Sequence, residues 1–169
     1  MTAGGIHGTY THTHVGPTPH RPVQSRPVTA HRTPFAADPA LPSLIDPDEK
    51  ESRWVQLDSR PDLQIWLLSW PAGTHKDWHD HGESVSAFQV VSGALFEQTS
   101  RKHRREFRTL NAGEGRSFEQ NHLHHLANVR AGTALSVHVS APRLTTTTRY
   151  EITPTGLQAM AAGKTELDW

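Results

Sequence analysis

Two histidines, His79 and His81, lie two positions apart in the segment 78–84. On an extended strand, residues at positions i and i+2 project to the same face, so both imidazoles can bind one metal ion. Thirteen histidines in 169 residues produce some close pairs by chance, and the pair therefore needs support from its surroundings. With that support, the spacing predicts a metal site.

Glycines flank the histidine pair at the spacing of a known signature. Gly73 precedes His79 by six positions, and Gly93 follows His81 by twelve. This pattern resembles the first signature of the cupin superfamily, with one departure. Ser86 stands where that signature usually carries a glutamate ligand.

A second cupin signature follows in degraded form. Gly113 stands eleven residues before His124, and Asn128 follows four residues after it. The proline and glycine that usually lie between are replaced by Glu119 and Asn121. Two linked matches in the right order arise by chance much more rarely than one.

The resemblance implies an all-β fold, a single-domain cupin whose double-stranded β-helix, or jelly roll, closes into a barrel. It also implies a metal ion held by His79, His81 and His124. The alignment of the third ligand is the weakest of the three, because His122 and His125 are neighbours that would serve equally well by residue type.

The strand pattern supports the barrel independently of the signatures. Residues 63–70 are rich in β-branched and aromatic side chains and end at the turn 71–73. Residues 87–96 continue this pattern across a turn at 92–93, and residues 133–139 alternate in polarity. We expect one face of the last segment to carry Leu135, Val137 and Val139, and the interior face beside the metal to carry Ala134, Ser136 and His138.

Composition and charge restrict the classes of partner. Seventeen basic and seventeen acidic residues balance, so no charge excess favours nucleic acid or an anionic membrane. The basic run 101–105 is short and lies where a hairpin turn is expected, which is typical of a solvated loop. No apolar run is long enough to span a bilayer and no signal-peptide pattern is present, so we expect a cytoplasmic protein. The chain contains no cysteine, which excludes disulfides and thiolate ligands from it.

The chain divides into three parts. Residues 1–42 contain five histidines among many prolines, threonines and glycines, which predicts an extended N-terminal arm without a core of its own. We expect the arm to lie on the barrel or on a neighbouring subunit, with metal buffering as the alternative. Residues 43–158 are assigned to the barrel and residues 159–169 to a C-terminal tail.

Three neutral imidazoles would leave a divalent metal with its full charge and about three open coordination positions. Such a site suits an anionic chelating substrate together with one more small ligand. Imidazole ligands accept iron, nickel, copper or zinc, so they do not identify the metal. A purely structural zinc site is disfavoured, because four protein ligands normally close such sites.

The chain resembles a family of thiol-oxidising cupins, the cysteine dioxygenases, from about residue 53 to residue 157. The residues that carry the resemblance are Trp70, His79, Asp80, His81, Gly82, Ser84, Ala87, Phe88, Gly93, His124, Asn128, Val129, the segment 134–138 and Pro142. In this family, three histidines bind ferrous iron, Fe(II), and cysteine chelates the metal through its thiolate and amine. Dioxygen is the co-substrate, and both of its atoms pass to sulfur to give cysteine sulfinate.

The resemblance assigns further roles to residues of this chain. Arg53 matches the arginine that binds the substrate carboxylate, a role that suits a planar bidentate donor. Ser136 and His138 match the first two members of a Ser-x-His-x-Tyr set near the substrate, in which the histidine orients the tyrosine. Such outer groups tune metal sites in general.

Four positions expected near the metal and the substrate depart from the family pattern. Ser140 replaces the tyrosine of the set, so the phenol that usually points at the metal is absent. Ser86 stands where animal members carry a cysteine cross-linked to that tyrosine, and Glu51 replaces another tyrosine two residues before the arginine. Arg143 follows Pro142 and adds a cation near the barrel rim.

These observations support three hypotheses. The first is oxidation of L-cysteine to the sulfinate at iron. The second is a diverged enzyme of natural-product biosynthesis that rearranges L-cysteine oxidatively to a sulfonamide-bearing aldehyde, with nickel, Ni(II), as the alternative metal; the serines at 86 and 140 favour this divergence. Other thiol acids such as 3-mercaptopropionate are disfavoured by the retained arginine. The third is a non-catalytic cupin that binds a metal and a small ligand. A homodimer is expected in each case, because cupins often pair through their sheets.

Overall fold

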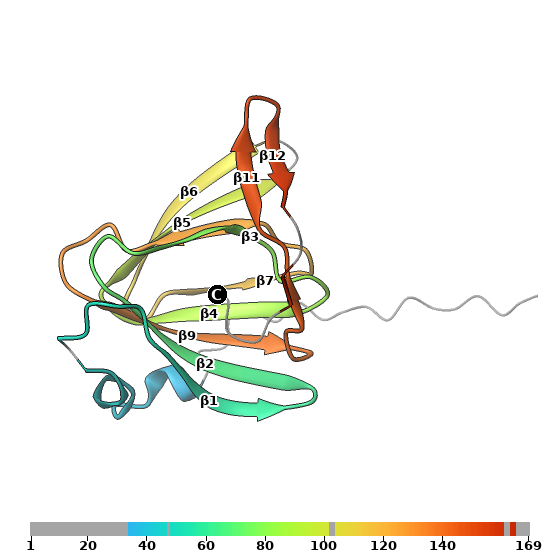
Figure 1. Ribbon diagram of the computed structural model, residues 1–169. Coiled ribbons are helices and arrows are strands. Elements are labelled where there is room, and N and C mark those ends of the chain that lie inside the picture. The colour runs from blue at the N-terminus through green and yellow to red at the C-terminus, as the bar shows by residue number, and fades with distance from the viewer. Residues whose placement is uncertain (1–33, 47, 102–103, 161–162, 165–169) are drawn as a thin grey trace, which may run out of the picture.

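The computed structural model describes residues 34–46, 48–101, 104–160 and 163–164. Within them the chain forms two short 3-10 helices and a series of strands, with no α-helix among the described residues (Figure 1). The elements are η1 (Pro34–Ala37), η2 (Leu41–Leu44), β1 (Trp54–Arg60), β2 (Leu63–Trp70), β3 (His75–His79), β4 (Val85–Ser92), β5 (Ala94–Arg101), β6 (Arg104–Asn111), β7 (Gly115–Phe118), β8 (His124–Ala127), β9 (Ala134–Ala141), β10 (Thr146–Thr147), β11 (Tyr150–Thr153), β12 (Gly156–Ala159) and β13 (Gly163–Lys164).

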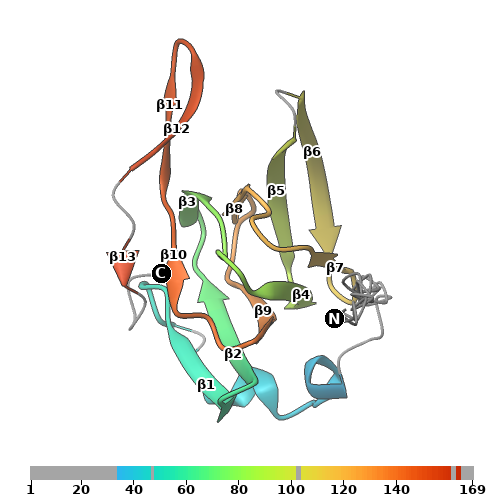
Figure 2. The ribbon, with the colours of Figure 1, turned by 90° about the vertical axis from the view of Figure 1, so that its right-hand side faces the viewer.

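Two antiparallel sheets face each other and form the barrel (Figures 1 and 2). One sheet has the strand order β1-β2-β9-β4-β7, and the other has the order β3-β8-β5-β6. Strands that are distant in the sequence are therefore neighbours, as in a double-stranded β-helix. The predicted all-β cupin barrel is confirmed.

The predicted strands coincide with observed ones. β2 covers the predicted segment 63–70, β9 begins within the alternating segment 133–139, and the turn between β4 and β5 falls at Gly93. Gly93 has a φ of +72°, and a Cβ at this position would lie 2.9 Å from the Cβ of Ala134. The turn therefore requires glycine for both conformation and space.

The basic run lies at a hairpin, as expected. β5 ends at Arg101, β6 begins at Arg104, and these two residues pair across the two strands.

Two hydrophobic clusters lie on opposite faces of the five-stranded sheet. The inner cluster fills the barrel and includes Leu68, Trp70, Phe88 and Leu95. The outer cluster is built around Leu67. Its buried members are Leu41, Ile45, Ile65, Leu67, Leu135 and Val137.

The outer cluster attaches η1 and η2 to the barrel. Leu41, the first residue of η2, and Ile45, which follows its last residue, are only 4% and 6% exposed. The predicted boundary between arm and barrel at 42/43 thus falls inside η2, where the chain packs on the sheet. The rest of the predicted arm, residues 1–33, lies outside the described residues.

The remaining strands form two small sheets beside the barrel. β10 pairs with β13, and β11 pairs with β12 in a hairpin that projects from the barrel (Figure 2). β12 includes Ala159, the first residue of the predicted tail. Among the described residues, no helix has the length and apolar character required to span a membrane.

Candidate metal centre

Three histidines from two neighbouring strands and the segment that follows one of them meet inside the barrel. His79 ends β3, His81 lies two residues further along, and His124 begins β8, where it pairs with His79 across the two strands. Their side chains are 7%, 6% and 1% exposed. One ring nitrogen from each lies within 4.8 Å of the other two. The structure thus brings together the three ligands that the sequence predicts.

Each of the three imidazoles is oriented by a partner at Nδ1. The Nδ1 of His79 lies 2.7 Å from the carbonyl oxygen of Asp77, and that of His81 lies 2.7 Å from Ser86 Oγ. The Nδ1 of His124 lies 3.2 Å from a carboxylate oxygen of Glu97. A proton on Nδ1 that donates to such an oxygen leaves the lone pair on Nε2, which is then the coordinating atom.

The separation of the coordinating atoms fits a metal ion. The Nε2 atoms of His81 and His124 lie 3.3 Å apart. Metal–nitrogen bonds of about 2.0–2.1 Å place two ligand nitrogens roughly 2.8–3.0 Å apart in octahedral geometry and roughly 3.3–3.4 Å apart in tetrahedral geometry. Two lone pairs facing each other in a buried site repel, and a divalent cation between them removes this repulsion. The donor set therefore fits a resident metal, although it does not identify which one.

The three imidazoles are neutral at neutral pH. Burial lowers the pKa of His79 to about 4. Burial also lowers the pKa values of His81 and His124 well below the ordinary histidine value, and the neighbouring ligand histidines add to this effect. Neutral imidazoles coordinate a metal without first releasing a proton.

Glu97 is a buried carboxylate beside the triad that the sequence alone did not single out. It lies on β5, is 1% exposed, and binds both His124 and Arg116, the latter at 2.8 Å. Burial raises the pKa of Glu97, while the charge of Arg116 lowers it. A carboxylate that holds a ligand histidine is a common feature of metal sites. The signal in the sequence was the alternation of β5, because Leu95 and Thr99 put Glu97 on the interior face.

The structure distinguishes the three candidates for the third ligand. His125 faces away from the triad and stacks on His75, with ring centroids 5.8 Å apart. His122 stacks on Phe118 at 4.3 Å, and its Nε2 is buried without a hydrogen-bond partner among the described residues. His124 is the one that lies with His79 and His81, although His122, Glu97 and His124 also form a group of ligand atoms within 4.8 Å of one another.

Ser136 and His138 form a hydrogen-bonded unit on the inner face of β9. The indole of Trp70 donates to Ser136 Oγ at 2.8 Å, and this oxygen lies 2.9 Å from the Nε2 of His138. The His138 ring stacks on Phe88 with centroids 5.1 Å apart. Burial lowers the pKa of His138 to about 3, so the ring is neutral at neutral pH. The expected interior face of this strand is confirmed.

The two serines that depart from the family pattern lie next to each other. Ser86 Oγ and Ser140 Oγ are 3.1 Å apart, and both side chains are 4% exposed. Because Ser86 also contacts the Nδ1 of His81, a chain of two hydroxyl groups leads from Ser140 to a predicted metal ligand.

A small cavity lies beside the hydroxyl groups of Ser86 and Ser140. Its volume is about 10 Å³, close to the minimum for one water molecule. The lining residues are Trp54, Trp66, Leu68, His81, His138 and Ser140. The indole nitrogen of Trp66 is buried without a hydrogen-bond partner among the described residues. This volume is too small for an amino acid, and the indoles of Trp54 and Trp66 form part of the cavity wall.

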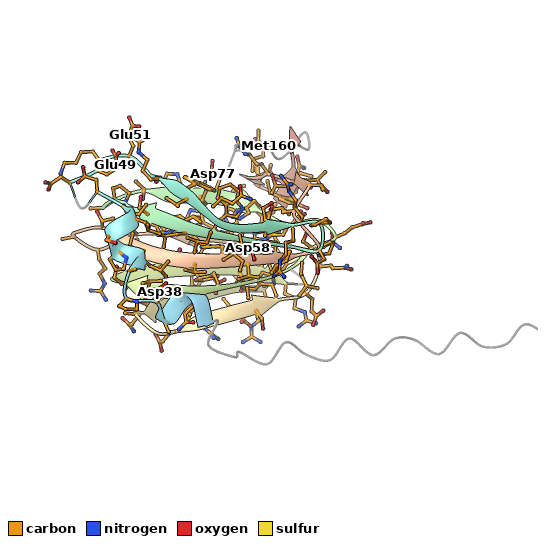
Figure 3. The ribbon with its side chains drawn as sticks, turned by 90° about the horizontal axis from the view of Figure 1, so that it is seen from below. Asp38, Glu49, Glu51, Asp58, Asp77 and Met160 are labelled. Carbon is orange, nitrogen blue, oxygen red and sulfur yellow. The ribbon has the colours of Figure 1, made fainter. Side chains whose placement is uncertain are left out.

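Arg53 and Glu51 lie outside this cavity. Arg53 precedes β1, its side chain is 57% exposed, and its Nε donates to a carboxylate oxygen of Glu49 at 2.5 Å. Glu51 is exposed, and Figure 3 shows that Glu49 and Glu51 extend away from the strands at the rim of the molecule. Neither Arg53 nor Glu51 lines the cavity. Their roles in substrate binding stay predictions, and the role of Arg53 requires its ion pair with Glu49 to open.

A comparison of the sequence with protein-family models finds a match. The model described as cysteine dioxygenase type I matches residues 43–153. The matched range contains all three triad histidines and every strand of the two barrel sheets. No sequence among the curated proteins matches this chain.

Solved structures resemble the fold at low sequence identity. A protein with a double-stranded β-helix domain from Klebsiella pneumoniae is 16% identical, with a TM-score of 0.53 over 72% of this chain and 94% of its own. A cupin superfamily protein from Desulfitobacterium hafniense is 15% identical, with a TM-score of 0.51 over 67% of this chain and 92% of its own. An oxalate oxidase is 16% identical, with a TM-score of 0.52 over 70% of this chain and 65% of its own. These likenesses show the cupin fold.

Proposed function

Because the chain belongs to the cysteine dioxygenase type I family of cupins, we propose that it oxidises the sulfur of L-cysteine with dioxygen. The family match and the triad support an oxidoreductase-type cupin enzyme that depends on a metal. The observation that carries the proposal is the convergence of three buried, neutral imidazoles beside a cavity lined by His138 and Ser140.

The reaction balances without an external reductant. Two sulfur–oxygen bonds form, the dioxygen bond breaks, and the thiol proton is released to give cysteine sulfinate. Sulfur loses four electrons and dioxygen gains them. When bound at the triad, a divalent metal supplies a cationic centre at which a thiolate and dioxygen can meet.

The residues of the chain position the reactants. Glu97, Ser86 and the Asp77 carbonyl fix the orientation of the ligand imidazoles through Nδ1. The buried indole N–H of Trp66 has no partner among the described residues, which suits it to donate to the carboxylate of the substrate. Arg53 would bind the same carboxylate if it left Glu49.

The hydroxyl pair of Ser86 and Ser140 favours a second candidate. Where the family usually has a phenol, this chain has a smaller hydroxyl that is linked to His81 through Ser86. The candidate is oxidative rearrangement of L-cysteine to a sulfonamide-bearing aldehyde with loss of carbon dioxide. Its balance requires two molecules of dioxygen for each cysteine and also releases water.

One experiment separates these reactions. Full-length protein is reconstituted in parallel with iron(II) and nickel(II), incubated aerobically with L-cysteine, and analysed by mass spectrometry with an oxygen electrode. A product with two added oxygens, all carbons and one dioxygen consumed supports the sulfinate proposal. Loss of carbon dioxide, a new nitrogen–sulfur bond and two dioxygens consumed support the second candidate instead. No consumption of cysteine with either metal contradicts both.

Histidine variants provide the matched controls. His124→Ala removes a triad ligand and should abolish both metal binding and cysteine consumption, whereas His125→Ala changes the adjacent residue on the other face of β8 and should preserve both. Metal content is measured by mass spectrometry of the purified variants. Retained metal in His124→Ala would assign the third ligand to another histidine.

A further inference from the structure

A second, larger cleft lies on the Nδ1 side of His124. Its volume is about 330 Å³, which falls in the usual range for sites of small ligands. Its charged lining residues are Glu97, Arg104, Arg105, Glu106, Arg108 and Arg116. None of these residues lines the small cavity beside His81 and Ser140.

The strand register explains why so many charges face one another. On β5 and β6, Leu95 pairs with Leu110, and both are buried in the inner cluster, so this face of the hairpin is the interior one. Two residues further along, Glu97 pairs with Arg108 on the same face. Arg116 reaches Glu97 from β7 in the opposite sheet.

The cleft lies where the barrel is not closed by hydrogen bonds. β6 is the edge strand of the four-stranded sheet, and β7 is the edge strand of the five-stranded sheet. The two edges lie on the same side of the molecule, at the right in Figure 2. A ligand can therefore approach the arginines from solvent through this opening.

The cleft carries an excess of positive charge. Four arginines line it against two glutamates, and Glu97 is already engaged by Arg116 and His124. The guanidinium groups of Arg104 and Arg108 form no ion pair with any described residue.

We propose that this cleft binds a small organic anion, with its sulfonate, phosphate or carboxylate group held between Arg108 and Arg116. Planar guanidinium groups bind such oxyanions through two parallel hydrogen bonds. Because Arg116 also holds Glu97, the bound anion is connected to His124 through two side chains, those of Arg116 and Glu97. The site stands on these residues alone and does not depend on the oxidation of cysteine.

Calorimetry with sulfate and methanesulfonate tests the site. Full-length, metal-loaded protein is titrated with each anion while chloride keeps the ionic strength constant, which separates specific binding from general screening. We expect saturable binding that Arg108→Gln weakens by about tenfold or more, since a charge-assisted bidentate contact is lost. Arg104→Gln should also weaken binding. Circular dichroism checks that each variant is folded.

Two further variants make the test decisive. Arg60→Gln changes an exposed arginine on β1 that pairs with Asp58, far from the cleft in the strand order, and should leave binding unchanged. His79→Ala disrupts the triad and should retain anion binding, which distinguishes the cleft from the metal. The proposal is overturned if the unaltered protein shows no saturable binding, if Arg60→Gln weakens binding as much as Arg108→Gln, or if binding is lost in His79→Ala.

Discussion

Glu97 shows how one buried charge is tolerated inside a small barrel. A buried carboxylate is costly unless it is paired and hydrogen-bonded. Here one oxygen accepts from Arg116 at 2.8 Å, and the other lies 3.2 Å from the Nδ1 of His124. The same contacts that stabilise the charge also fix the tautomer and the direction of a ligand imidazole.

Replacing this carboxylate with an amide is therefore expected to weaken metal binding. Glu97→Gln keeps an oxygen for the Nδ1 of His124 but removes its negative charge, and we expect the dissociation constant of the metal to rise by about 10- to 100-fold. Competition against a chromophoric chelator measures this change. Glu151→Gln, an exposed position on β11, serves as the control. An unchanged affinity in Glu97→Gln would mean that the contact with His124 does not affect the metal.

Arg53 and Arg60 form a matched pair for the substrate carboxylate. Both are exposed arginines at the two ends of β1, and each is paired with one acidic residue. If Arg53 leaves Glu49 to bind the carboxylate, Arg53→Ala should raise the KM for L-cysteine by about tenfold or more. Arg60→Ala should leave the KM unchanged in the same steady-state assay. Equal KM values for all three proteins would remove Arg53 from the substrate site.

At the scale of elements, one face of β2 lines the small cavity and the other face packs the outer hydrophobic cluster. Its inner face contributes Trp66 and Leu68 to the lining of the small cavity, whereas its outer face packs Ile65 and Leu67 against the cluster that holds η2. Because successive residues of a strand alternate between faces, stability and chemistry depend on different side chains of the same strand.

A core truncation on the outer face should lower stability without changing the metal site. Leu67 is fully buried, so Leu67→Ala should reduce the free energy of unfolding by about 2–5 kcal/mol. Leu44→Ala, at a side chain that is 49% exposed, should change it by less than about 0.5 kcal/mol. Urea denaturation measures stability, and metal content should remain the same in both variants. Loss of metal from folded Leu67→Ala would show that the two faces are coupled.

The strand β8 determines which of three neighbouring histidines joins the triad. Alternation places His124 and Leu126 inside and His125 outside, and the pairing with β3 sets His124 opposite His79. His122 precedes the strand and packs on Phe118 instead. Element boundaries and register, rather than residue type, therefore select the ligand.

At the scale of the whole molecule, the barrel concentrates neutral histidines in its interior, which makes its stability depend on pH. Burial lowers the pKa of His138 from the ordinary value of 6.5 to about 3. Below about pH 6.5 the unfolded chain takes up a proton at this residue that the folded chain does not. The contribution to stability is complete above pH 6.5 and is lost progressively as the pH falls toward 3.

Urea denaturation of metal-free protein tests this dependence. Between pH 7.5 and pH 5, we expect the unaltered protein to lose on the order of 1 to 2 kcal/mol more than His138→Gln, because the variant lacks the titrating ring. Using metal-free protein in both arms prevents release of the metal in acid from contributing to the difference. Identical losses in the two proteins would show that His138 is equally easy to protonate in the folded and unfolded states.

Two separate cavities lie beside the triad. The small cavity lies beside His81, His138 and Ser140, while the arginine-lined cleft lies on the Glu97 side of His124 between the edges of the two sheets. The predicted homodimer stays a prediction, since the structure describes a single chain. The cytoplasmic location and the identity of the metal likewise stay predictions.

The sequence by itself determined the features that depend on local spacing. The β-branched and aromatic content of residues 63–70 located β2, and alternation located β9. The glycine at position 93 marked the turn after β4, and the two-residue spacing identified His79 and His81 as a pair. These are consequences of backbone geometry within a few residues, so a short window of sequence contains them.

Only the tertiary structure decided the features that depend on partners far apart in the chain. It selected His124 over its neighbours and placed Glu97 between that ligand and Arg116. It also gathered the arginines of β6 and β7 into one cleft. The physical reason is that strand register and sheet order set these contacts, and both are fixed by packing of the whole barrel rather than by any local pattern.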